Sequence, residues 1–168
     1  MNQIDCKQAQ RVWSRVMAAQ TGGASEAAAP TAPQTQTQTL LTAQEVLSCM
    51  QAELSDAATY RALSARMKGA GRRCMQQLSR EECRHAKKLG AIYFLLTGKK
   101  ACPAQAKAPC ITCNAETLRK QYQAELAARD GYEQLAARAG SRACTLRTLA
   151  LDECRHAQQI YSLLQTCL

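Results

Sequence analysis

The chain uses histidine only twice, and both histidines occur in nearly the same six-residue phrase. The phrase EECRHA contains Glu82 and His85, and the phrase DECRHA contains Glu153 and His156. In each copy the glutamate precedes the histidine by three residues, so the two side chains share one face of a helix. Carboxylate oxygen and imidazole nitrogen together suit iron or manganese, and zinc less distinctively. The repeated pair therefore indicates a metal site made from two helices.

A second repeat lies upstream of each phrase and adds two more carboxylates. The segment ELSDAATYRALSAR (53–66) aligns without a gap with ELAARDGYEQLAAR (125–138). Each copy carries a glutamate and a tyrosine seven residues apart, which places the two side chains on one helix face, two turns apart. The four residues are Glu53, Tyr60, Glu125 and Tyr132.

Four long helices must position these side chains, and the sequence predicts where they begin and end. The letters TAQE at Thr42 are typical of a capping box, and Gly98 is a plausible C-terminal stop. Two prolines within residues 98–113 exclude one continuous helix there, whereas Asn114 and Ser141 can cap the last two helices. The predicted helices span about 42–67, 72–97, 114–139 and 141–166.

This pattern predicts an all-α fold, a four-helix bundle of two helical hairpins joined by a long crossover. Counted from its own turn, each hairpin brings one upstream glutamate and one Glu-x-x-His pair to the same level, near the middle of the helices. If the hairpins pack face to face, four carboxylates and two imidazoles meet at the centre of the bundle.

Four carboxylates cannot share a dry core without compensation, because burial and mutual repulsion both oppose their ionisation. Two divalent metal ions would balance four negative charges. One glutamate from each of two helices, with Glu-x-x-His from each of the other two, is the ligand pattern of di-iron carboxylate bundles. The alternative is a duplication that copied an exposed Glu/His pair on a solvated helix face.

At these residues the chain resembles the ferritin-like superfamily, and within it the rubrerythrins. The resemblance covers about residues 42–167, or about three quarters of the chain, and depends on the phrase [Asp/Glu]-Glu-x-Arg-His paired with two upstream glutamates. It implies a ferritin-like bundle with two bound iron ions, which manganese or zinc could replace. The implied ligands are bridging Glu82 and Glu153, terminal Glu53 and Glu125, and one histidine for each iron, His85 and His156.

The resemblance also implies roles for four neighbouring residues. Asp152 and Glu81 would each orient an imidazole across the bundle. Tyr60 and Tyr132 would hydrogen-bond near the metals as catalytic-site residues. The alternatives are a solvated helix face for the two acidic residues and ordinary core packing for the two tyrosines.

The chain departs from the rubrerythrin pattern at two places. Ala128 stands where rubrerythrins typically carry an extra glutamate, one turn after the ligand of the third helix. A rubredoxin domain with two CxxC pairs is also missing, since there is one CxxC, formed by Cys110 and Cys113. This pair could be redox-active thiols, a second metal site with Cys102, or incidental loop cysteines. Electrons would come from thiols or from an external donor such as a rubredoxin-like protein.

Composition bounds the cellular setting. Ten cysteines without a signal-peptide pattern favour reduced thiols and a cytoplasmic protein, and no apolar run is long enough for a membrane span. The net charge of +9 is scattered along helices without aromatic interleaving, so we do not expect nucleic acid as a partner. We expect an N-terminal amphipathic helix over 1–19, a flexible linker over 20–41 and the bundle over 42–168; the chain could act as a homodimer.

The expected function is a non-haem di-iron oxidoreductase that reduces hydrogen peroxide or dioxygen in oxidative-stress defence. The alternatives are a ferroxidase or iron-binding ferritin-like protein, and a dimanganese catalase-like enzyme. A third alternative, hydroxylation of an anionic substrate such as RNA, is supported by the basic charge alone. The least favoured alternative is a scaffold bundle that binds no metal.

Overall fold

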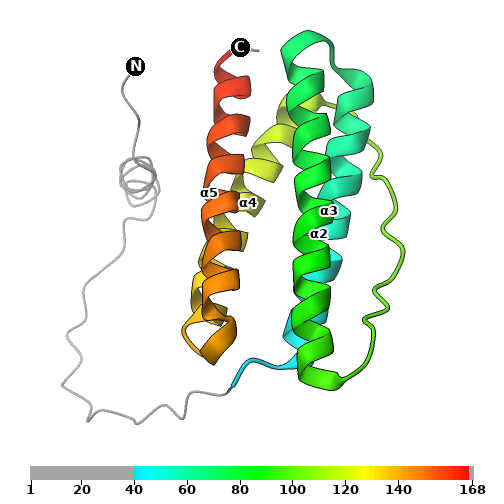
Figure 1. The fold of residues 1–168 in the computed structure, drawn as a ribbon. Helices are drawn as coiled ribbons and strands as arrows, with labels where there is room; N and C mark the ends of the chain where they lie inside the picture. The colour runs from blue at the N-terminus through cyan, green and yellow to red at the C-terminus, as the bar shows by residue number, and fades with distance from the viewer. Residues whose placement is uncertain (1–39, 167–168) are drawn as a thin grey trace, which may run out of the picture. The chain divides into compact units, whose positions relative to one another are not determined.

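The computed structural model describes residues 40–166, so the predicted N-terminal helix and most of the predicted linker lie outside the described residues. The described part is helical and contains no strand, as predicted (Figure 1). Its elements are the four helices α2 (Ala43–Arg66), α3 (Gly69–Thr97), α4 (Asn114–Ala136) and α5 (Ala143–Thr166), with a 3-10 turn, η1 (Gly140–Arg142).

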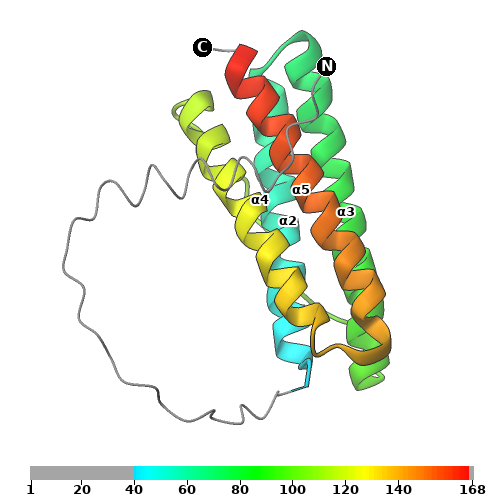
Figure 2. The ribbon, with the colours of Figure 1, turned by 90° about the vertical axis from the view of Figure 1, so that its left-hand side faces the viewer.

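The helices form two antiparallel hairpins, α2 with α3 and α4 with α5. The crossover, residues 98–113, runs along the outside of the bundle from the end of α3 to the opposite end, where α4 begins (Figures 1 and 2). The turns of the two hairpins therefore lie at opposite ends of the bundle. As a result α2 is antiparallel to α4, and α3 is antiparallel to α5, which gives the two hairpins an approximate twofold relationship.

The first two helices begin and end for reasons that the sequence makes visible. Thr42 and Glu45 form the predicted capping box, with Thr42 N donating to Glu45 Oε2 at 2.9 Å and Glu45 N donating to Thr42 Oγ1 at 3.3 Å. Helix α3 begins at Gly69, three residues earlier than predicted. It ends at Gly98, which adopts the left-handed conformation with φ of 68°, a conformation that glycine adopts without a Cβ penalty.

Two predicted caps in the second hairpin are wrong. Cys113, not Asn114, occupies the N-cap position of α4, and Asn114 Oδ1 instead accepts a hydrogen bond from Arg66 Nε at 2.8 Å. Helix α4 ends at Ala136, and the chain then passes through the 3-10 turn before α5 begins at Ala143. Ser141 therefore lies inside that turn rather than at the start of a helix.

Apolar side chains gather in two clusters, one toward each end of the bundle. One cluster joins the start of α2, the end of α3, the end of α4 and the start of α5, and includes Val46, Leu89, Leu135 and Leu149. The other joins the opposite ends of the same helices and includes Leu63, Leu78, Leu118 and Ile160. Burial of such side chains stabilises the fold by about 2 kcal/mol each. The middle of the bundle, between the clusters, is left for polar residues.

None of the described helices is long and apolar enough to cross a membrane.

Candidate metal centre

The six predicted ligands meet in the middle of the bundle, and all are almost fully buried. Each helix contributes at least one of them: α2 gives a glutamate, α4 gives a glutamate, and α3 and α5 each give a Glu-x-x-His pair. The least buried of the six is only 4% exposed. The six residues are Glu53, Glu82, His85, Glu125, Glu153 and His156.

His85 presents its Nδ1 atom to three carboxylates. Nδ1 lies 3.2 Å from Glu53 Oε2, 3.0 Å from Glu82 Oε2 and 2.9 Å from Glu153 Oε1. Three helices, α2, α3 and α5, therefore converge on one imidazole nitrogen.

His156 repeats this arrangement from the other hairpin. Its Nδ1 atom lies 2.8 Å from Glu82 Oε1, 3.2 Å from Glu153 Oε2 and 3.5 Å from Glu125 Oε2. The two imidazole rings stack with their centroids 5.3 Å apart and 18° between their planes. Glu82 and Glu153 thus each contact both histidines.

The spacing of these atoms fits metal ligands better than a hydrogen-bonded network. One N–H can satisfy one oxygen well, yet each Nδ1 faces three oxygens, and Glu82 Oε1 and Glu153 Oε1 have no hydrogen-bond partner despite lying 2.8 Å and 2.9 Å from an imidazole nitrogen. A metal–ligand distance of about 2.1 Å would separate neighbouring octahedral ligands by about 3.0 Å. One ligand atom from each of four residues lies within 4.8 Å of the others: Glu82, His85, Glu153 and His156. This buried group could hold a metal ion.

The outer nitrogen of each imidazole contacts a carboxylate from the other hairpin. His85 Nε2 lies 3.2 Å from Asp152 Oδ2, and His156 Nε2 lies 2.7 Å from Glu81 Oε2. Arg155 joins the two carboxylates, since its Nη2 lies 2.7 Å from Asp152 Oδ1 and 3.4 Å from Glu81 Oε2. A carboxylate on Nε2 favours the tautomer that leaves the Nδ1 lone pair free for a metal.

The two tyrosines also act across the hairpins. Tyr60 donates its hydroxyl hydrogen to Glu125 Oε1, and Tyr132 donates to Glu53 Oε1. Burial and the adjacent glutamate raise the pKa of both tyrosines well above the usual value. Both hydroxyls therefore stay protonated and available as donors that hold the terminal carboxylates in place.

The electrostatics divide the four glutamates into two kinds. Burial, reinforced by neighbouring carboxylates, raises the pKa of Glu53 and Glu125 well above the usual range. Burial opposes ionisation of Glu82 and Glu153 as well, but their close contacts with both imidazoles outweigh it and lower their pKa. Glu53 and Glu125 thus favour the protonated form in the metal-free protein, whereas Glu82 and Glu153 favour the ionised form.

Both histidines favour the protonated form when no metal is bound. Burial disfavours the charged ring, but contacts with Glu153, Glu53 and Glu82 outweigh burial and raise the pKa of His85 to about 12. The pKa of His156 is raised by the corresponding carboxylates. Two imidazolium rings then balance two ionised bridging glutamates, so the metal-free cluster has no net charge. Two divalent ions with four ionised glutamates have no net charge either.

The cysteines predicted as redox thiols or as a second metal site lie in the crossover. Cys110, Cys113 and Cys102 carry exposed free thiols. Among the described residues, the buried Glu/His cluster is the group of side chains whose geometry suits a metal ion. A redox or metal-binding role of the CxxC pair stays a prediction.

A polar pair beside the centre was not predicted. Gln121 Nε2 donates to Asp56 Oδ1 at 2.7 Å, which links α4 to α2 next to Glu53 and Glu125. Burial raises the pKa of Asp56 to about 6, although the bond from Gln121 opposes this shift. The pair could have been predicted from the spacing, because Asp56 follows Glu53 by three residues and Gln121 precedes Glu125 by four. Each therefore shares a helix face with a predicted ligand.

No family model, no curated protein and no solved structure matches this chain. The ligand chemistry of the buried cluster is therefore the basis on which a function is proposed.

Proposed function

We propose that this chain is a rubrerythrin-like, non-haem di-iron oxidoreductase that reduces hydrogen peroxide or dioxygen. The observation that carries the proposal is the pair of buried imidazole Nδ1 atoms, each facing one terminal and two shared carboxylates at 2.8–3.5 Å. Oxygen and nitrogen ligands in this number suit iron or manganese, and zinc less distinctively. Two such sets that share Glu82 and Glu153 provide for two metal ions.

Glu82 and Glu153 would bridge the two ions, Glu53 and His85 would bind one of them, and Glu125 and His156 would bind the other. Two ferrous ions can supply the two electrons that, with two protons, convert one hydrogen peroxide molecule to two waters. An external donor such as a rubredoxin-like protein would then return two electrons to the centre.

The residues of the chain contribute position and exclusion of water. Glu81 and Asp152 hold the imidazole rings in one orientation and one tautomer. Tyr60 and Tyr132 hold the terminal carboxylates through their hydroxyls. The apolar clusters above and below the centre keep bulk water away, which strengthens the electrostatic interactions within it.

A ferroxidase or iron-binding function is the second candidate, and Ala128 favours it. This position lies one turn after Glu125, where a further carboxylate is expected in rubrerythrins, and alanine supplies no ligand. A centre with six rather than seven ligand residues could oxidise iron without efficient turnover of peroxide.

Single-turnover kinetics distinguish these functions. Ferrous-loaded protein would be mixed anaerobically with hydrogen peroxide and, in a parallel sample, with dissolved oxygen, and oxidation of the iron followed by near-ultraviolet absorbance. We expect faster oxidation by peroxide, with about two electrons consumed per peroxide. Faster reaction with oxygen would favour the ferroxidase, and stable ferrous iron with both oxidants would overturn an oxidoreductase function. A dimanganese catalase-like enzyme would instead release oxygen from peroxide when loaded with manganese.

A further inference from the structure

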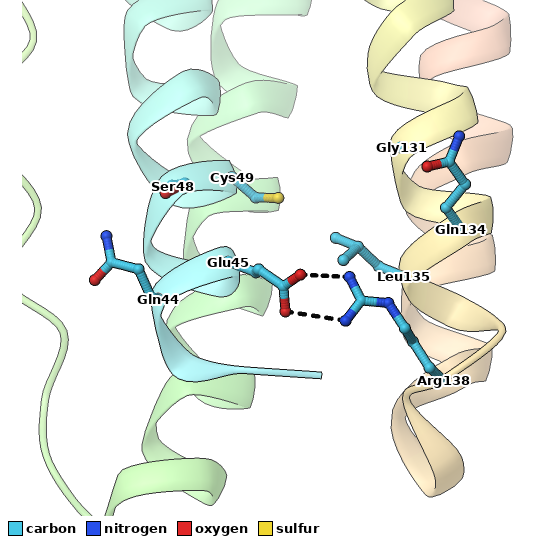
Figure 3. A pocket seen from close by; sticks show the side chains of 8 residues that line it. All are labelled: Gln44, Glu45, Ser48, Cys49, Gly131, Gln134, Leu135 and Arg138. Atoms are coloured by element: carbon cyan, nitrogen blue, oxygen red, sulfur yellow. Dashed lines mark hydrogen bonds and ion pairs between the residues drawn. The ribbon is translucent and has the colours of Figure 1, made fainter. Parts of the chain in front are cut away.

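A pocket of about 320 Å³ opens between the start of α2 and the end of α4 (Figure 3). On the α2 side it is lined by Glu45, Ser48 and Cys49, and on the α4 side by Gly131, Leu135 and Arg138. Glu45 and Arg138 point toward one another and form an ion pair between the helices, with Arg138 Nη1 lying 3.2 Å from Glu45 Oε2. The two charges of the pocket therefore neutralise each other.

Two residues of the pocket wall lie close in sequence to residues of the candidate metal centre. Cys49 precedes Glu53 by four residues, so the two lie one turn apart, about 6 Å along the helix axis. Gly131 is next in sequence to Tyr132, whose hydroxyl donates to Glu53. The pocket thus approaches the carboxylate that faces His85.

The rest of the wall is uncharged. Burial, together with the nearby carboxylates of Glu53 and Glu45, raises the pKa of Cys49 to about 11, so the thiol is neutral at pH 7. Ser48, Leu135 and the backbone at Gly131 add no charge. Such a surface suits a small uncharged molecule better than an anion.

The approximate twofold relationship between the hairpins is broken at this pocket. Extending the gapless alignment of the two upstream repeats pairs Cys49 with Gln121, and Gly131 with Thr59. On that counterpart side Gln121 hydrogen-bonds Asp56 at 2.7 Å, and Thr59 is buried. The pocket side of the centre therefore carries the smaller residues of each pair, Cys49 and Gly131. The counterpart side carries the larger ones, Gln121 and Thr59.

We propose that the pocket beside Cys49 and Gly131 is the access route by which a small uncharged oxidant, hydrogen peroxide or dioxygen, reaches the His85 half of the centre. The inference rests on the proposed function and specifies the side from which the oxidant reaches the centre. The two metal positions become inequivalent, because the Glu53 and His85 half faces the pocket while the Asp56–Gln121 pair covers the counterpart side.

Gly131 allows the route to be closed without disturbing the helices. A Cβ atom built on Gly131 meets nothing within 4 Å, so added atoms project into open space. Replacing a helical glycine by alanine also favours the helix, by up to about 1 kcal/mol. Gly131→Leu narrows the pocket, Gly131→Ala occupies a small part of it, and Ala127→Leu adds the same side chain as Gly131→Leu at an exposed position of α4.

Two readouts test the route. The first uses metal-free protein treated with methyl methanethiosulfonate, a small neutral thiol reagent, and compares labelling of Cys49 with that of the exposed Cys144 by peptide mapping. The second measures, by stopped flow, the rate at which ferrous-loaded protein takes up nitric oxide, a small neutral metal ligand. We expect Gly131→Leu to slow both rates about tenfold, with Gly131→Ala intermediate and Ala127→Leu unchanged, because the leucine side chain narrows the pocket next to Cys49.

Slower labelling of Cys49 and slower nitric oxide uptake in Gly131→Leu, with both rates unchanged in Ala127→Leu, would support the route. An unchanged uptake rate in Gly131→Leu, with or without protection of Cys49, would overturn it, because the ligand would then reach the metal elsewhere. Failure of the proposed function is recognised separately, because the ferrous-loaded protein would then resist oxidation by both peroxide and oxygen, whatever its rate of nitric oxide uptake. Circular dichroism of each variant identifies any change in folding.

Discussion

Glu81 Oε2 of one hairpin lies 2.7 Å from His156 Nε2 of the other. The reciprocal contact joins Asp152 Oδ2 to His85 Nε2 at 3.2 Å. Each histidine is thus oriented by the hairpin to which it does not belong. The imidazole rings are therefore oriented only when the two hairpins pack against each other.

We predict that Glu81→Ala and Asp152→Ala each weaken metal binding by about 10- to 100-fold, because the imidazole loses the partner that orients it. Each variant should weaken mainly one of two binding events: the event at His156 for Glu81→Ala, and the event at His85 for Asp152→Ala. Competition titration with a chromophoric chelator measures both. Equal affinity in the parent and both variants would contradict the orienting role of these two carboxylates.

We predict that Tyr60→Phe and Tyr132→Phe each destabilise the metal-free protein by about 1–3 kcal/mol, because a buried carboxyl group loses its hydroxyl donor. The two variants should behave alike, since each removes one bond between a tyrosine and a terminal glutamate of the other hairpin. Urea denaturation followed by circular dichroism gives the free energy of unfolding. If a variant is as stable as the parent, the tyrosine hydroxyl makes no net contribution to the free energy of unfolding, which contradicts the prediction.

We predict that metal binding releases about four protons per chain when two ions bind, because metal ligation requires deprotonated groups. The raised pKa values of His85, His156, Glu53 and Glu125 identify these four groups as the proton sources. Metal affinity should consequently fall as the pH is lowered. Calorimetric titrations in buffers of different ionisation enthalpy count the released protons. Release of fewer than one proton would contradict the charge balance described for the cluster.

We predict that Glu45 makes a small, pH-dependent contribution to the free energy of unfolding. The hydrogen bond from Arg138, with those from Thr42, lowers the pKa of Glu45 to about 2. The ionised form is therefore stabilised by folding, and this stability is present above the usual pKa near 4.5 and is lost as the pH falls toward 2. Because the pair is partly exposed, solvent screening limits the effect to less than about 1 kcal/mol.

Glu45→Gln tests this effect, because glutamine can still serve in the capping box but carries no charge. The parent should be more stable than the variant at pH 7, and the difference should shrink between pH 5 and pH 3. Thermal unfolding at each pH measures it. A difference that grows on acidification would contradict the direction of the pKa shift.

The six candidate ligands could be predicted from the sequence because their positions depend on local spacing. Because an α-helix has 3.6 residues per turn, the three-residue spacing places Glu82 beside His85. The same spacing in the repeated phrase places Glu153 beside His156. Their convergence followed from counting residues from each hairpin turn. The structure places all six predicted ligands in one cluster, in contact with both tyrosines and with the carboxylates of Glu81 and Asp152.

Other features depend on contacts that spacing does not describe. The pocket beside Cys49 exists because Gly131, from a distant segment, leaves space opposite it. The side chain of Asn114 bonds Arg66 rather than capping its own helix, because the end of α2 lies next to the start of α4. Such outcomes are set by which side chains meet across the bundle, and they became visible only in three dimensions.

Metal stoichiometry tests the central claim most directly. Protein prepared without oxygen would be incubated with excess ferrous iron, desalted and analysed by inductively coupled plasma mass spectrometry, beside a Glu82→Ala/Glu153→Ala variant that lacks both bridging ligands. We predict about two irons per chain for the parent, as the proposed di-iron centre requires, and a large loss for the variant. A fully helical parent that retains no metal, or a variant that retains as much iron as the parent, would contradict the assignment of this cluster as a metal centre.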